Sequence, residues 1–217
     1  MIWLLDFSDT LASGSKTWAF EYAFPTIIAE HHLPVDEVAF RDATLFAQKR
    51  ARETDDESLV LTELFVRLNW PDHLKPELTR RIFEECAAEL YEDTLPFLER
   101  LRQASQTVYV VSNTNDTAQL LDQFGLTHYF QQIVTPERSG GLPGKPSRAM
   151  WDYLVSQAGD APLDSAIVVG DDPWSDGAFA EACGLQCWII DRTGRLESLY
   201  DTMPFGWARS LLDIPFE

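Results

Sequence analysis

Short runs of consecutive apolar residues stand out along the chain, and each ends abruptly in polar or glycine residues. Four are clear, at Ile2–Leu5, Val108–Val111, Ala166–Val169 and Cys187–Ile190, and a weaker one lies at Ile133–Val134. Their Val, Ile, Leu and aromatic content is typical of buried strands. Continuous apolar strands separated by helical stretches belong to parallel sheets that are covered on both faces, so the pattern predicts an α/β fold with about five parallel strands.

Helical periodicity occupies the intervals between these runs. After Val108 it predicts helices at Thr117–Phe124, Ser147–Gln157 and Gly177–Cys183, with glycines placed at their carboxyl ends. Between the first two strands it predicts helices at Trp18–Glu30, Val35–Arg52, Ser58–Leu68 and Leu78–Tyr91. That interval is far longer than a strand-to-helix connection needs. We therefore expect an inserted helical subdomain at residues 13–94 and a core formed by residues 1–12 and 95–217, with Ile2–Leu5 at its centre between Val108–Val111 and Ala166–Val169.

The net charge of the chain bears on which classes of molecule it can bind. The chain of 217 residues has 35 acidic and 17 basic side chains and a formal net charge of −18. Such a chain is repelled by nucleic-acid backbones and by anionic membrane surfaces, so we expect neither as a partner. A ligand that is itself an anion requires locally gathered cations.

Cysteine usage and the first residues favour a cytoplasmic protein. The three cysteines, Cys86, Cys183 and Cys187, fit neither a disulfide framework nor a zinc motif, and they suit a reducing compartment. The opening MIWLLD has no basic segment, and Asp6 interrupts its apolar run too early for a signal peptide or a membrane span.

Polar residues of a particular kind follow the predicted strands, where ligands bind in open parallel sheets. Asp6, Ser112 and Asp171 each come directly after a strand, and Lys145 lies in a glycine-rich loop. Taken singly, such residues are most often turn, cap or solvated surface residues. Taken together, two carboxylates suit Mg²⁺, and a hydroxyl, the Asn113 amide and an ammonium suit an anion. Together these groups are suited to catalyse phosphoryl transfer.

The order and spacing of these segments resemble the haloacid dehalogenase (HAD) superfamily. WLLDFSDTL at residues 3–11 resembles its apolar strand followed by DxDx[TV], and VVSN at 110–113 its strand followed by Ser or Thr. GKPS at 144–147 resembles its lysine at the start of a helix, and VVGDDPWSD at 168–176 its strand followed by GDxxxxD. The resemblance covers essentially the whole chain, and it implies a Rossmann-like core with an inserted α-helical cap of the C1 type.

The resemblance also implies roles for individual residues. Asp6 would be the nucleophile that forms an aspartyl-phosphate, and Lys145 would neutralise it and the transferred group. Mg²⁺ would be bound by Asp6, the backbone carbonyl of Ser8 and Asp171. Ser112 and the backbone amide of Asn113 would hold the phosphoryl oxygens. Asp176 would orient Lys145 or a metal-bound water, and Asp172 is a weaker ligand candidate. The implied activity is a Mg²⁺-dependent phosphatase acting on a small phosphorylated metabolite.

One residue departs from the family pattern. The second Asp of DxDx[TV], which protonates the leaving alcohol in the family's phosphatases, is Ser8 here, and Asp9 stands where Gly is usual. A serine hydroxyl cannot serve as that acid at neutral pH, and losing a general acid–base costs about 10²–10⁴ in rate. If the backbone stays extended, Asp9 points to the opposite side from Ser8, so it could take the role only through a shifted turn.

The departure keeps alternatives open. A catalytically impaired HAD-fold protein that binds a phosphorylated ligand or a protein partner is the main one. Dehalogenases and phosphonatases also lack Asp at this position, but the family's dehalogenases work without metal and lack the acid that stands here as Asp171. A phosphonatase needs a cap lysine, and nothing distinguishes Lys16, Lys49 or Lys75.

Two further features are candidates for substrate contact. The run Lys49-Arg50-Ala51-Arg52 is either a solvated helix end, favoured by the helix dipole, or a site that attracts the nonreacting part of an anionic substrate. Trp174, within the fourth motif, is the tryptophan we expect near the site.

Overall fold

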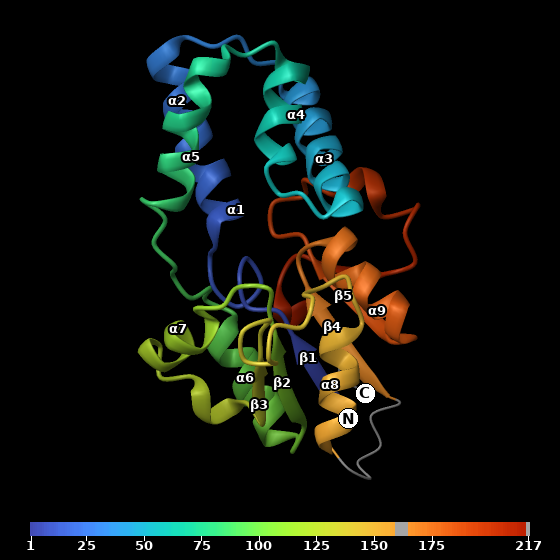
Figure 1. Ribbon diagram of the computed structural model, residues 1–217. Helices are drawn as coiled ribbons and strands as arrows, with labels where there is room; N and C mark the ends of the chain where they lie inside the picture. Colours follow the sequence, from blue (N-terminus) through green and yellow to red (C-terminus); the bar gives the residue numbers. More distant parts are fainter. Residues whose placement is uncertain (159–164, 216–217) are drawn as a thin grey trace. The chain divides into compact units, whose positions relative to one another are not determined.

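A computed structural model describes residues 1–158 and 165–215 of the chain. The chain divides into two compact units (Figure 1). The core unit consists of Met1–Ala12 and Ala88–Glu217, and the helical unit is Ser13–Ala87. Each is described by itself below.

The core unit contains a six-stranded, entirely parallel sheet with flanking helices, in the order β3-β2-β1-β4-β5-β6 (Figure 1). The strands are β1 (Ile2–Leu5), β2 (Thr107–Val111), β3 (Gln132–Val134), β4 (Ala166–Gly170), β5 (Gln186–Ile190) and β6 (Gly206–Ala208). The central position of β1 between β2 and β4 confirms the predicted order, and the architecture is the expected Rossmann-like α/β fold. The register pairs Leu5 with Val110 on one side and with Val169 on the other, so the three strands end together.

Strand β6 is the one that the apolar pattern did not predict. It has three residues, begins with a glycine and leaves Trp207 only partly buried. A strand this short at the edge of a sheet has neither an apolar run nor an alternation to reveal it.

Apolar packing fixes the sheet against its helices. Trp3 and Phe97 are almost completely buried, and their rings meet edge to face at 5.7 Å. Phe97 lies on α6 (Thr94–Gln103), a helix that the sequence pattern did not predict and that has Pro96 as its third residue. Proline is tolerated in the first turn of a helix, where backbone N–H groups have no intrahelical acceptor, so this one does not end α6.

The other helices of the core unit lie close to their predicted ranges. They are α7 (Thr117–Gln123), α8 (Ala149–Ala158) and α9 (Ala178–Cys183). A π-helical turn at Pro173–Gly177 leads directly into α9. Because this turn follows β4, it holds Asp176, the last acidic residue of the fourth motif, at the carboxyl end of the sheet.

The helical unit consists of α1 (Ser15–Trp18), α2 (Phe24–His31), α3 (Glu37–Thr54), α4 (Leu59–Leu68) and α5 (Lys75–Phe83), with a π-helical turn at Ala19–Ala23 joining the first two. It has its own apolar core, in which Phe65 meets Trp70 edge to face at 5.5 Å. The helix predicted to run to Tyr91 ends instead at Phe83. Among helices of the described residues, none has both the length and the apolar character needed to cross a membrane.

The second boundary between the units falls earlier in the chain than residue 94. Leu90 pairs with Ala12 as an antiparallel bridge, and the Tyr91 N–H donates to the Leu11 carbonyl at 3.2 Å. These backbone hydrogen bonds join residues 88–94 to the first core segment, whereas the sequence pattern had continued the helical insert through them.

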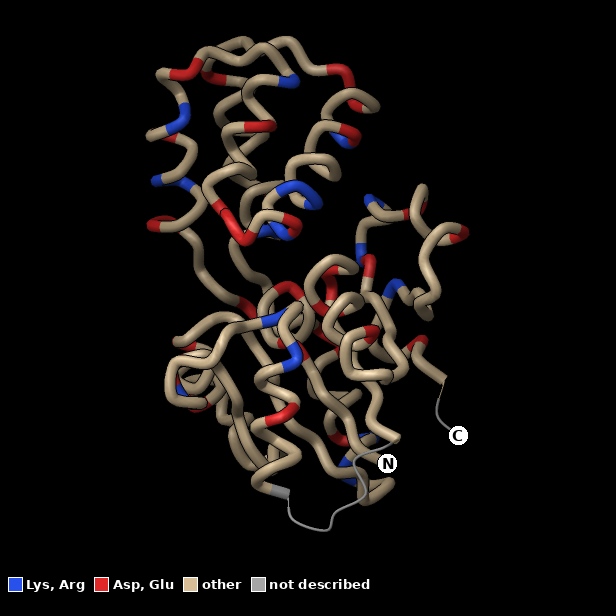
Figure 2. Tube along the Cα trace, turned by 45° about the vertical axis from the view of Figure 1, so that its right-hand side comes forward, with Lys and Arg blue, Asp and Glu red and all other residues tan. Residues whose placement is uncertain are grey.

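Charge is unevenly divided between the units. Slightly more than half of the lysines and arginines lie in the helical unit, which is about a third of the chain (Figure 2). The core unit therefore carries most of the net negative charge.

Candidate active site

Asp6 and Asp171 lie at the carboxyl ends of two adjacent central strands. Asp6 follows β1, and its N–H donates to the Val169 carbonyl of β4 at 2.8 Å, which continues the strand pairing by one residue. Asp171 follows Gly170, the last residue of β4. The sheet register therefore places both residues at the carboxyl end of the sheet.

Lys145 joins Asp6 to Asp176. Its Nζ lies 2.7 Å from Asp6 Oδ1 and 2.5 Å from Asp176 Oδ1, and its side chain is only 3% exposed. A lysine taken alone is most often solvated, and this one is not. Burial of an ammonium group is favourable only where carboxylates compensate its charge, as these two do.

The side chain of Asn113 fixes the backbone at Lys145. Its Oδ1 accepts from the Lys145 N–H at 2.7 Å, and its Nδ2 donates to the Lys145 carbonyl at 2.8 Å. This reciprocal pair links the loop after β2 to the loop that carries the lysine. Both polar atoms of the Asn113 side chain are thereby engaged by the Lys145 backbone.

Asp176 also organises the turn after β4. Its Oδ2 accepts from the N–H groups of Asp171, at 3.2 Å, and Asp172, at 3.1 Å. The Asp172 carboxylate accepts from the N–H groups of Trp174 and Ser175 at the start of the π-helical turn. Asp172 therefore acts as a cap of this turn, and Trp174 lies within it, half-buried.

Ser112 is fully buried at the end of β2. Its Oγ accepts from the Thr114 N–H at 3.2 Å and lies 3.0 Å from Thr117 Oγ1. These contacts orient the hydroxyl within the loop that begins at the carboxyl end of the sheet.

The chain turns sharply after Phe7. The Ser8 hydroxyl is 3.3 Å from the Thr114 hydroxyl. Position 8 therefore offers a hydroxyl and not the carboxylate that the family pattern has there. Asp9 is buried in the left-handed region, at φ 62°, so the extended backbone considered for Asp9 does not occur. Thr10 Oγ1 donates a long hydrogen bond of 3.3 Å to Asp6 Oδ2.

Burial and neighbouring charges alter the acidity of the central pair. Burial raises the pKa of Asp6 to about 6, against the opposing effect of the Lys145 ammonium, and repulsion from Asp176 adds to the rise. Burial acts to lower the pKa of Lys145, but the carboxylates of Asp176 and Asp6 outweigh it, so the net direction is upward. Lys145 is therefore a permanent cation.

The carboxylates form a donor set that fits a hard divalent cation. Oxygens of Asp6, Asp171 and Asp176 all lie within 4.8 Å of one another. Carboxylate oxygens are the ligands that Mg²⁺ prefers. Three carboxylates around one ammonium leave negative charge for a cation to neutralise. Arg195 interacts electrostatically with Asp171 and with Asp9, while burial lowers the pKa of its guanidinium.

A family model for haloacid dehalogenase-like hydrolases matches residues 3–184, which include Asp6, Ser112, Lys145, Asp171 and Asp176 but not Arg195. The chain belongs to the haloacid dehalogenase-like hydrolases.

The chain is also similar to individual proteins, a phosphatase in sequence and HAD hydrolases in structure. A ribulose-1,5-bisphosphate 5-phosphatase from Halopiger xanaduensis is 32% identical over 104 residues, which are 47% of this chain and 42% of that protein. A HAD family hydrolase from Deinococcus radiodurans with bound phosphate and sodium has a TM-score of 0.67 at 20% identity, covering 98% of this chain and 92% of its own. A putative HAD hydrolase, YfnB from Bacillus subtilis, bound to magnesium, has a TM-score of 0.65 at 20% identity, covering 98% and 95%.

Three residues of this HAD-like hydrolase, Thr10, Thr114 and Arg195, lie near the predicted site although the sequence did not assign them to it. Thr10 belongs to the first motif, so the sequence placed it near Asp6, but the sequence could not show its hydrogen bond to that residue. Thr114 and Arg195 gave no signal, because their proximity to Ser8 and to the acidic residues depends on how the loops fold.

Two of the three cations in the run from Lys49 to Arg52 form ion pairs within the helical unit. Lys49 lies 3.7 Å from Glu53, Arg52 pairs with Glu57, and Arg50 is exposed. These contacts fit a solvated helix end.

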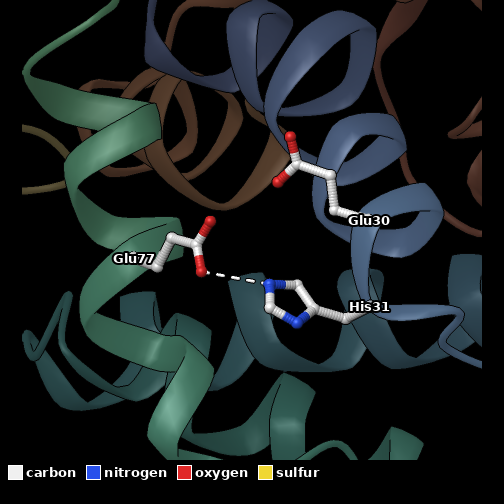
Figure 3. Close-up of side chains that lie close together, drawn as sticks. All are labelled: Glu30, His31 and Glu77. Atoms are coloured by element: carbon white, nitrogen blue, oxygen red, sulfur yellow. Dashed lines mark hydrogen bonds and ion pairs between the residues drawn. The ribbon is translucent and has the colours of Figure 1, made fainter.

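A second cluster of potential metal ligands lies in the helical unit of the hydrolase, between α2 and α5 (Figure 3). His31 Nε2 is 3.1 Å from Glu77 Oε2, and Glu30 lies beside them. Arg81 Nη2 is 2.5 Å from Glu30 and 2.7 Å from Glu77. The guanidinium already compensates both carboxylates, so this cluster is an ion-pair network.

Proposed function

We propose that this HAD-like hydrolase is a Mg²⁺-dependent phosphatase that acts on a small phosphorylated metabolite. The observation that carries the proposal is the buried Lys145 ammonium between Asp6 and Asp176, beside Asp171, at the carboxyl end of the sheet. A carboxylate, a cation and a hard-metal donor set in one place are what phosphoryl transfer requires.

Asp6 is the proposed nucleophile. Its carboxylate oxygen forms a bond to phosphorus as the bond from phosphorus to the leaving oxygen breaks, which gives an aspartyl-phosphate and an alkoxide or aryloxide that takes a proton from water. Water then attacks that phosphorus, releases inorganic phosphate and restores the carboxylate. Lys145 neutralises the nucleophile and the transferred group, and the Ser112 hydroxyl and the Asn113 N–H hold phosphoryl oxygens.

Asp6, the backbone carbonyl of Ser8 and Asp171 are the groups that would hold Mg²⁺. When bound, the ion would supply positive charge against the phosphoryl oxygens and the surrounding carboxylates. The excess of carboxylates over cations around Asp6 supports this assignment. The magnesium-bound relative from Bacillus subtilis supports it further.

The chemistry of the site and one relative support a small phosphorylated metabolite as the substrate. A fully buried hydroxyl and a buried ammonium suit a phosphoryl group, and the Halopiger xanaduensis relative is a phosphatase of a sugar bisphosphate. We further propose that the helical unit serves as a C1-type cap that selects the rest of the substrate.

A second candidate function rests on Ser8. Its hydroxyl contacts that of Thr114, and no carboxylate stands at this position to protonate a leaving group. This favours a protein of the same fold that binds a phosphorylated ligand and turns it over poorly.

Turnover distinguishes the two. We expect a panel of phosphorylated metabolites and aryl phosphates to contain substrates that require Mg²⁺ and lose activity in EDTA. Asp6→Asn should abolish turnover, whereas the matched control Asp122→Asn on α7, whose side chain is exposed, should not. Activity unaffected by EDTA would contradict the metal-dependent phosphatase. Tight binding with no turnover would favour the second candidate.

A further inference from the structure

Arg192 lies where the chain leaves the core unit and where it returns. The first core segment ends at Ala12 and the second begins at Ala88. Arg192 Nη2 donates to the Thr10 carbonyl of the first segment at 2.8 Å, and Nη1 lies 2.7 Å from Asp93 Oδ2 of the second. One guanidinium therefore holds both segments.

Tyr91 completes the surroundings of this guanidinium. Arg192 Cζ lies 3.8 Å from the centroid of the Tyr91 ring. A planar cation that stacks on an aromatic ring while donating to two acceptors uses properties that lysine does not have. The side chain is only 20% exposed, so these contacts are partly shielded from water.

Asp93 is held in place by the rest of the core unit. Its Oδ2 also accepts from the Ser210 hydroxyl, at 2.7 Å, and from the Leu211 N–H, at 2.8 Å. Burial raises the pKa of Asp93, but hydrogen bonds from Arg192 and Ser210 outweigh burial and lower it, so the carboxylate is charged. Arg192 is thus anchored on a fixed acceptor.

Through Thr10, Arg192 is connected to Asp6, the proposed nucleophile. Thr10 is fully buried, and it offers its carbonyl to Arg192 and its hydroxyl to Asp6. Thr10 lies in the sharp turn after Phe7, in which the Asp9 N–H donates to the Ala12 carbonyl at 2.6 Å. A displacement of the Thr10 backbone therefore displaces the group that orients Asp6.

We propose that Arg192 is a positioning residue, which acts through Thr10 to hold Asp6 in its reactive orientation and fastens the two chain segments that flank the helical unit. The catalytic part of this inference rests on the proposed function of Asp6. A small displacement of a nucleophile is costly, since about 1 Å can lower a rate by about a hundredfold.

Arg192→Lys keeps the charge and removes the two-acceptor, stacked geometry. We expect kcat to fall about tenfold while KM changes by less than about twofold, because orientation and not ground-state binding is lost. The matched control is Arg81→Lys, at an arginine of similar exposure that bridges two carboxylates within the helical unit, and it should leave kcat unchanged.

A double-mutant cycle with Thr10→Val separates positioning from general stability. Thr10→Val removes the hydroxyl that contacts Asp6, so Arg192→Lys should change kcat by less than about twofold in that background. Effects that multiply would overturn the proposal.

Hydrogen exchange tests the same contact without any substrate. Arg192→Lys should speed exchange at backbone amides of residues 9–12 and 91–94 selectively, and Arg81→Lys should not. Asp93→Asn, a milder change, should speed exchange at 91–94 if Arg192→Lys does not fold. Unchanged exchange in these segments would overturn the role of Arg192, even if the wild type hydrolyses no phosphate ester. That absence of hydrolysis would instead refute the proposed function.

Discussion

Ser8 is the residue at which this hydrolase departs from its family's phosphatases. Its hydroxyl meets Thr114, and the nearest acid in the chain, Asp9, is buried in a left-handed turn in the electrostatic vicinity of Arg195. No carboxylate stands at position 8 to donate a proton to the leaving group. We therefore expect leaving-group protonation and breakdown of the aspartyl-phosphate to be slow, and substrates with good leaving groups to be favoured.

Replacing Ser8 by Asp should restore the missing acid while leaving the backbone carbonyl unchanged. We expect Ser8→Asp to hydrolyse alkyl phosphates at least about tenfold faster than the wild type, within the usual range for general acid–base catalysis. Ser8→Asn, which has a similar shape and no ionisable group, is the control and should give no gain. Steady-state rates on alkyl and aryl phosphates measure both. A Ser8→Asp protein that binds Mg²⁺ and is no faster would contradict the account.

Asp6 should make the metal-free protein less stable as pH rises. Its pKa in the folded protein is about 6, above the ordinary value of 3.8, so the folded state retains a proton that the unfolded chain loses between these values. From pH of about 4 to about 6, the wild type should lose free energy of unfolding relative to Asp6→Asn, which cannot titrate. Urea unfolding in EDTA measures this difference. A difference between the wild type and Asp6→Asn that stays constant over this pH range would contradict the cause given.

The sequence predicted the site residues that directly follow strands better than those that lie farther along the loops. Asp6 and Asp171 could be placed together because parallel strands end at one edge. Lys145 was a candidate ammonium from its glycine-rich loop, and its role beside Asp6 came from the family resemblance. The contacts of Thr10, Thr114 and Arg192 could not be foreseen, because they arise where loops distant in sequence meet.

At the scale of elements, the segment from β4 into the π-helical turn Pro173–Gly177 controls the site. Asp176 reaches back from this turn to accept the N–H groups of Asp171 and Asp172 and to hold Lys145. This close return requires a residue without Cβ at Gly170, where an added Cβ would lie 2.0 Å from Asp176 Cγ.

Gly170→Ala should therefore displace Asp176. We expect the free energy of unfolding to fall by about 1–3 kcal/mol, as in overpacked sites, with loss of most turnover. Gly184→Ala is the control, since its φ of +71° gives a cost of about 1–2 kcal/mol but no atom lies within 4 Å of the added Cβ. It should retain turnover. Chemical unfolding and steady-state kinetics compare them, and full activity of Gly170→Ala would refute this role of Asp176.

Elements with a strong local pattern were predicted well, and those that depend on tertiary contacts were not. The buried strands β1 and β4 are continuous apolar runs, so their sequences sufficed. The chain after Phe83 has a helical pattern, but Leu90 and Tyr91 make backbone hydrogen bonds to the first core segment instead. Long-range pairing of this kind overrides local propensity.

At the scale of the whole molecule, the chain has two units with separate apolar cores. Phe97 lies in the core of one and Phe65 in that of the other, each nearly inaccessible to solvent. Units with their own cores can unfold in separate steps.

Calorimetry should therefore resolve two unfolding transitions. Phe65→Ala should lower the transition of the helical unit and Phe97→Ala that of the core unit, each by the equivalent of about 3–5 kcal/mol. Mg²⁺ should raise only the transition that Phe97→Ala lowers, because a ligand stabilises the unit that binds it. A single transition that both variants shift equally would contradict the independence of the units.

The central claim is that Asp6 attacks phosphorus, and the covalent intermediate tests it most directly. Because Ser8 offers no base for its hydrolysis, the aspartyl-phosphate should accumulate during turnover of an aryl phosphate with Mg²⁺. Acid quenching followed by mass spectrometry of the intact protein and its peptides should reveal one added phosphoryl group, on the peptide that contains Asp6, and none in Asp6→Asn. Turnover with no labelled protein, or a label on a different residue, would contradict the account.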